Sequence, residues 1–230
     1  MTSTTRSRTD ARPGRLERLG GISALVAAGT FAYGIALFAT SLADYTDPDA
    51  SPAELVDFLV GHQGTLLAWY LGIFIVFGAA LVPFAMALRA RLAERAPLLA
   101  DAGAVFAVIW VGLMFATGMV SNIGIEVVAD LAETDPDQAV AVWSSIDAVT
   151  NGLGGGNELV GGIWILLVSL AGLTTALLPR WLNVVGIVTA VAGVLTVIPA
   201  FEAIEMVFGL GSIVWFIGAG LTLVRDEVPA

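Results

Sequence analysis

The chain has 230 residues, of which 57% are apolar even without glycine, whereas a soluble domain reaches about 45 to 50% with glycine included, so a water-soluble fold of this size is excluded. The net charge is −10, each of the 10 basic residues is arginine, and the chain has no cysteine and one histidine. These counts exclude a Schiff-base lysine, disulfides, thiolate metal sites and paired-histidine haem ligation, and we expect no cofactor.

Residues 1–18 are polar and carry five arginine residues with Pro13 and Gly14, a composition that predicts a disordered cytoplasmic tail. The apolar stretch 21–43 has about the 20 residues that a bilayer core demands and predicts the first span. Ser41 to Ala43 also resembles a signal-peptide cleavage site. The apolar region is longer than the roughly 7 to 15 residues of such peptides, so a span is the preferred interpretation.

The acidic loop after this span contains a predicted amphipathic helix over residues 52–60. Ser51 is a good N-cap, Pro52 suits the first helical position and Glu54 completes a capping box. We expect this helix to lie on the outer membrane surface and cap the bundle.

The second span is predicted over residues 65–88, with Trp69 and Tyr70 as interfacial anchors and Pro83 as a kink. The third is predicted over residues 98–120, and its helical pattern continues past the membrane edge to Ala132. A second external amphipathic helix is predicted over residues 139–149.

A helical hairpin follows. Predicted spans 157–178 and 182–198 are joined by the short turn Pro179-Arg180-Trp181, and the sixth span is predicted over residues 204–224 before a tail at 226–230. The small residues Gly186, Ala190, Gly193, Gly211 and Gly218 predict seams at which helices pack closely.

The arginine residues predict the orientation. In chain order the tail, the loops and the C-terminal segment hold five, none, three, none, one, none and one of them, and short cytoplasmic segments concentrate positive charge. The sequence therefore predicts an all-α polytopic membrane protein: one domain over residues 19–225, built as a bundle of six transmembrane helices with two short external helices and with both termini cytoplasmic.

The last three predicted spans carry the glycine-rich approach Gly152–Gly156, the Pro179-Arg180-Trp181-Leu182 turn followed by Gly186, and the closing stretch 211–223. In these features they resemble a family of bacterial and archaeal membrane proteins known as domain of unknown function 4386. The resemblance covers mainly the C-terminal three spans, and elsewhere it is one of size and layout. It implies a multi-pass fold in the plasma membrane of a prokaryote, the bacterial inner membrane, and it implies no activity.

Acids and amides gather at the predicted external end of the bundle. The candidate polar or cation site comprises Glu126, Asn122, Glu158, Asn157, Glu205 and Glu202. An ionisable group inside a membrane is costly and usually faces a partner or a water-filled cavity, so these residues are candidates for a cation or proton site, with Glu126 expected to face the interior. The alternative is that these acids are solvated, with Glu158 and Glu205 stabilised at helix N-termini by the macrodipole.

Three functions remain open on the sequence. The first is binding or movement of a small solute, ion or lipid through an outward-opening polar pocket. The second is a structural or regulatory subunit that docks a protein partner. The third is an intramembrane enzyme, for which one histidine supplies no Ser/His or histidine-metal constellation. The expected partners are the lipid bilayer and a small ion, solute or lipid. Nucleic acid is not an expected partner, and the oligomeric state is left open.

Overall fold

In the computed structural model, residues 14–46, 49–153 and 157–225 are described, and within these ranges the chain is helical and contains no strand. Five helical segments are long and apolar enough to cross a membrane. They are α1 (Arg15–Phe38), the continuous segment Gln63–Leu92, α5 (Pro97–Ala132), α7 (Glu158–Thr175) and α9 (Glu205–Arg225). The helix α8 (Arg180–Leu195) is apolar but shorter. This is an all-helical apolar bundle of the kind found in multi-pass membrane proteins.

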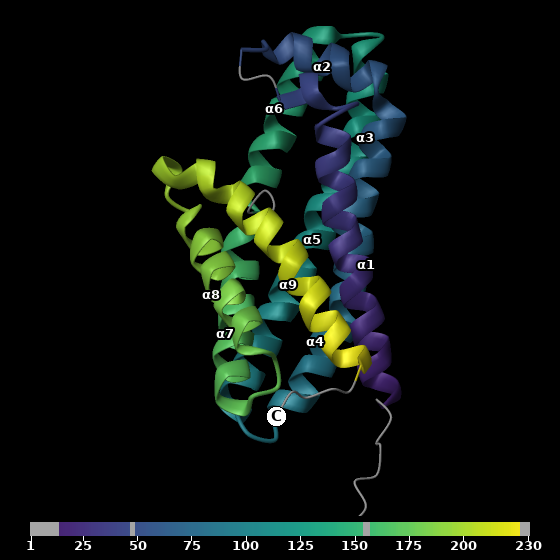
Figure 1. Ribbon diagram of the computed structural model, residues 1–230. Coiled ribbons are helices and arrows are strands. Elements are labelled where there is room, and N and C mark those ends of the chain that lie inside the picture. Colours follow the sequence, from purple (N-terminus) through teal and green to yellow (C-terminus); the bar gives the residue numbers. More distant parts are fainter. Residues whose placement is uncertain (1–13, 47–48, 154–156, 226–230) are drawn as a thin grey trace, which may run out of the picture.

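The bundle is elongated, and α9 crosses it obliquely, as Figure 1 shows. The start of α1, the turn between α7 and α8, and the end of α9 lie at its lower end, whereas α2 (Pro52–Gly61) and α6 (Pro136–Gly152) lie at its upper end. We call the upper part the head, comprising the short helix η1 (Ala43–Thr46), α2, α6 and residues 121–132 of α5. All the arginine residues in the described ranges belong to elements or turns at the lower end.

The first helix begins earlier than predicted. Residues 15–18 belong to α1 and not to a disordered tail, while residues 1–13 lie outside the described ranges. The Glu17 carboxylate accepts a hydrogen bond from the Gly14 backbone and pairs with Arg91, which orders the first turn. The helix also ends earlier than the predicted span, at Phe38, and a turn leads into η1.

The second apolar segment consists of α3 (Gln63–Tyr70), a π-helical turn η2 (Leu71–Val76) and α4 (Phe77–Leu92). Pro83 lies inside α4, as predicted, but the irregular hydrogen bonding occurs earlier, in η2. Tyr70 is buried against Phe74, with ring centroids 5.6 Å apart, so it is a packing residue rather than an exposed interfacial anchor.

The prediction that the third helix continues to Ala132 is confirmed, because α5 is a single helix of 36 residues, about 54 Å long. The predicted capping box at the start of α2 is also confirmed. The Ser51 hydroxyl accepts a hydrogen bond from the Glu54 amide, and the Glu54 carboxylate accepts one from the Ser51 amide at 2.7 Å.

The second head helix differs from its prediction in length and direction. With 17 residues, α6 is longer than 139–149, and it runs back along α5 instead of lying flat across the end of the bundle (Figure 1). Ala139 and Trp143 are buried on its inner face. A Cβ on Gly124 of α5 would lie 2.8 Å from Ile146 Cδ1, so a glycine is what lets the two helices approach this closely.

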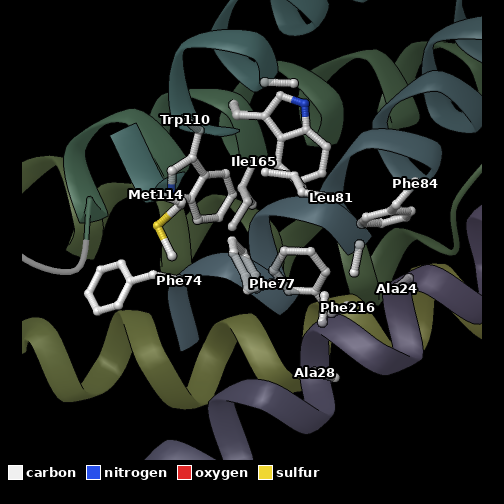
Figure 2. Packing of buried hydrophobic residues seen from close by; sticks show 14 of the residues in the cluster. Ala24, Ala28, Phe74, Phe77, Leu81, Phe84, Trp110, Met114, Ile165 and Phe216 are labelled. Atoms are coloured by element: carbon white, nitrogen blue, oxygen red, sulfur yellow. The ribbon is translucent and has the colours of Figure 1, made fainter. Parts of the chain in front are cut away.

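Aromatic side chains fill the centre of the bundle. Figure 2 shows Phe77 between Trp110 and Phe216, with centroid distances of 5.0 and 5.7 Å. Trp164 continues the cluster towards Trp215 at 5.4 Å. Each of these rings is essentially fully buried. The predicted small-residue seams are confirmed around them, since a Cβ on Gly186, Gly193, Gly211 or Gly218 would lie within 2.6 Å of an atom of a neighbouring helix.

Candidate functional site

The start of α7 is set by Asn157. This residue has φ of 64°, in the left-handed region that asparagine tolerates better than most residues, and it is 1% exposed. Its Nδ2 donates to Met114 Sδ at 3.5 Å. As a result α7 begins beside the middle of α5, which continues to Ala132, about 27 Å further along its axis.

Two of the predicted site acids are brought together here. Glu158 is the first residue of α7 and Glu205 the first of α9, where helix dipoles stabilise negative charge. The Glu158 side chain is half-buried, and the two carboxylates are close enough to interact electrostatically. The predicted grouping at this end of the bundle therefore holds for Glu158, its neighbour Asn157, and Glu205.

The structure does not place Glu126 in the bundle interior. Its side chain is exposed, because the face of α5 that meets the bundle is formed by Gly124, Ile125 and Val128. Asn122 is half-buried, and its Oδ1 is buried without a hydrogen-bond partner. Glu202 lies in the 3₁₀ helix η3 (Pro199–Ile204), and its side chain is outside the described part of the structure.

The geometry therefore differs from a convergence of three acids. Among the residues that the structure describes, no group of three or more histidine, aspartate or glutamate side chains is placed to hold a metal ion. What the structure shows at this end is a pair of acids at two helix starts and an apolar groove. A second pocket lies at the opposite end of the bundle, and the sequence indicated neither pocket.

The first pocket is an apolar groove between α5 and α6 in the head, with a volume of about 460 Å³. It is lined by Met119, Val120, Ile123, Gly124, Val127 and Ile146. Met119 is 57% exposed and Ile123 is 61% exposed, so large apolar side chains face outwards here. This groove is thus apolar, and an outward-opening polar pocket stays a prediction.

Three exposed acids lie close in sequence to residues that line this groove. Glu126 and Asp130 on α5 flank Val127, and Asp147 on α6 follows Ile146. The inter-span segments 44–64, 121–158 and 199–205 carry most of the chain's 20 acidic residues and no arginine. The head therefore has a strongly negative surface and contains an apolar groove.

A pair of tyrosine side chains, Tyr70 buried and Tyr45 half-buried, stabilises the head. The hydroxyl groups of Tyr45 on η1 and Tyr70 on α3 share a hydrogen bond, and Asp147 lies within electrostatic reach of both. Burial, followed by the neighbouring Tyr70, raises the pKa of the Tyr45 hydroxyl, so this side chain stays neutral. The Tyr45 ring also packs on Phe58 of α2 at 5.9 Å, so η1, α2 and α3 are held together at this point.

The second pocket lies at the opposite end of the bundle. It has a volume of about 410 Å³ and is lined by Glu17, Ala90, Arg91, Glu94, Arg95, Thr175, Ala176 and Leu177. We call it the inner pocket. Its charged residues come from α1, from the end of α4 and from the turn that follows α4, while α7 and the turn after it supply the rest.

Comparison of the chain with protein families, with curated proteins and with solved structures found no match. The resemblance to domain of unknown function 4386 thus stays a prediction, and function has to be argued from the two pockets. Neither was visible in the sequence, because the groove depends on how α6 packs back on α5, and the inner pocket combines residues from segments that are far apart in the chain. The nearest signal was the pattern of α5, whose apolar positions continue past the predicted membrane edge.

Proposed function

We propose that this chain is a six-span membrane protein with both termini in the cytoplasm and α8 as its sixth span. α8 has 16 residues and is about 24 Å long, but it packs along α7, and Val197 and Ile198 extend its exposed apolar surface. The arginine residues at the lower end support the cytoplasmic assignment of that end. The prokaryotic plasma membrane is the setting that the family resemblance implies.

The packed centre of the bundle favours binding over conduction. A transported solute would have to displace the aromatic cluster around Trp110 and Trp164, whose centroids are 5.8 Å apart. Close-packed interiors lose several kcal/mol, about 3 to 5, when one such ring is removed, so they do not open readily. Of the three functions left open by the sequence, docking of a partner is the one that the structure supports best.

We infer that the head docks a protein partner at the groove between α5 and α6, and the position of the groove carries this inference. α7 has 18 residues, about 27 Å, which nearly matches the bilayer core of about 30 Å, so the outer boundary of the hydrocarbon lies near Glu158. Asn157 marks the same level at Met114 on α5. Met119 is then about 8 Å and Val127 about 20 Å further out along the helix.

The groove consequently extends past the lipid headgroups, whose layer is about 5 to 8 Å thick on each side. An apolar patch in that position is exposed to water unless a partner covers it. The apolar lining requires an apolar contact face, and the exposed acids Glu126, Asp130 and Asp147, which are close to it in sequence, favour positive charge on the rest of the partner. The occupant that fits is an amphipathic helix of a partner protein with leucine-type residues on one face and lysine or arginine on the other.

Binding of designed helices tests this proposal. The protein is reconstituted in nanodiscs of uncharged lipid and titrated with a fluorescent synthetic helix of leucine and lysine, or with its leucine and glutamate counterpart. We expect saturable, salt-sensitive binding of the lysine helix alone. Ile123→Asn should raise its Kd about ten-fold, since it removes most of one apolar contact. Val149→Asn is the matched control, because Val149 is an exposed valine of α6 that does not line the groove.

Three outcomes would contradict the docking proposal. The lysine and glutamate helices could bind equally, or Ile123→Asn could bind as tightly as the wild type. The lysine helix could also bind empty nanodiscs to the same extent. A concentration-dependent dimer that Ile123→Asn dissociates would show instead that a second copy of the chain covers the groove.

A further inference from the structure

The inner pocket has walls held in place by charged hydrogen bonds. Arg91 Nε donates to Glu17 Oε1 at 2.7 Å, and the two side chains are 19% and 23% exposed. This pair joins the end of α4 to the start of α1. Arg95 Nη1 donates to the Thr175 carbonyl at 3.1 Å and joins the turn after α4 to the last turn of α7. The pocket is therefore pre-formed by three segments that are distant in the sequence.

Charge is balanced within the pocket. Two guanidinium groups, Arg91 and Arg95, and two carboxylates, Glu17 and Glu94, line the same space. An anion alone would face two carboxylates, and a cation alone would face two guanidinium groups. A ligand that carries both charges, a few bonds apart, is complementary to this arrangement.

The backbone at the end of α7 also favours a ligand that carries a positive charge beside its negative one. Ala176 has φ of 55°, which ends α7 in a left-handed turn and leaves the negative end of the helix dipole at the pocket. Arg95 donates one of its five N–H groups to Thr175, and a guanidinium recognises phosphate through such a fork of donors.

We propose that the inner pocket binds an aminoalkyl phosphate group, with the phosphate at Arg95 and the ammonium at Glu94. The pocket lies at the last turn of α7, about 27 Å from the start of that helix, which is the depth at which lipid phosphates lie. The source that fits this location is the headgroup of phosphatidylethanolamine in the inner leaflet. This site is independent of the docking groove, since it lies at the other end of the bundle and shares no residue with it.

Lipid titration tests the proposal on the full-length protein. The purified protein is stripped of lipid in detergent and titrated with short-chain phosphatidylethanolamine, phosphatidylglycerol or phosphatidylcholine, and binding is read by native mass spectrometry and by the melting temperature. We expect the ethanolamine lipid to bind about ten-fold more tightly than the other two. The glycerol lipid lacks the ammonium, and the choline lipid has no N–H to donate to Glu94.

Two variants separate the two halves of the site. Arg95→Gln should raise the Kd of the ethanolamine and glycerol lipids about ten-fold, while Glu94→Gln should remove the preference for ethanolamine over glycerol and leave phosphate binding in place. Arg89→Gln is the matched control. Arg89 lies on α4 and pairs with Asp101 at 2.7 Å; like Arg95 it is exposed, but it does not line the pocket.

The proposal fails if the three lipids bind equally, if Glu94→Gln leaves the preference unchanged, or if Arg89→Gln weakens binding as much as Arg95→Gln. Arg95→Lys covers the case in which Arg95→Gln does not fold, because lysine keeps the charge and should retain the order of the three lipids. A separate titration with free phosphoethanolamine shows whether the pocket recognises the lipid or the soluble group. Binding of that soluble group as tightly as the lipid would overturn the lipid assignment.

Discussion

Substitution of Gly162 by alanine tests the packing of α7 on α8. A Cβ at this position would lie 2.8 Å from the Ala190 carbonyl oxygen and 3.1 Å from the Val194 amide nitrogen. Both are backbone atoms, so no change of rotamer relieves the contact. Ordinary van der Waals contact begins at 3.4 Å, so the two helices must separate by about 0.6 Å at their crossing. A gap of about that size loses a quarter or more of the van der Waals energy of each contact between the two helices. Overpacking of this kind lowers the free energy of unfolding by about 1–3 kcal/mol.

Gly112→Ala is the matched control. Gly112 lies in the interior of α5, where an added Cβ meets nothing within 4 Å, so both substitutions gain the helix propensity of alanine and only one introduces the clash. We expect the free energy of unfolding of Gly162→Ala to be about 1–3 kcal/mol below that of Gly112→Ala. Titration of the micelle-bound protein with a denaturing detergent, followed by circular dichroism, measures both. Equal transition midpoints for the two variants would refute the reasoning.

Further predictions concern the head, the α7–α8 turn and the topology. Ser51→Ala should destabilise α2 by about 0.5–2 kcal/mol, seen as faster amide exchange in that helix alone. Hydrogen bonds from Ser51 lower the pKa of Glu54, so its stabilisation of α2 is present above the ordinary pKa of about 4.3 and is lost as the pH falls through the lower folded value. Glu54→Gln should remove this acid sensitivity of exchange. Asn183→Ala should cost about 1–3 kcal/mol in detergent unfolding, because a buried carbonyl in the turn after α7 loses its donor. A cysteine at Ala141 should react with an impermeant thiol reagent on intact cells and one at Ala93 should not; the opposite pattern would reverse the proposed orientation.

Local information explains which structural features the sequence predicted well. The membrane class follows from composition, which depends on no contact. The start of α2 at Ser51 and the continuation of α5 to Ala132 follow from capping chemistry and helical periodicity, both of which act within a few residues. The sequence also placed Glu158 and Glu205 at the starts of their helices, and the structure shows that they interact.

Tertiary contacts decided the rest. α1 begins at Arg15 because Glu17 meets Arg91, a residue 74 positions later, and no local pattern signals that pair. Glu126 is exposed because packing on the neighbouring helices sets the rotation of α5, and helical spacing alone does not say which face turns inwards. The groove depends on the packing of α6 on α5, and the inner pocket on the ends of helices that are distant in the chain. Composition and periodicity therefore determined that this chain is a helical membrane protein, and packing determined where it can bind anything.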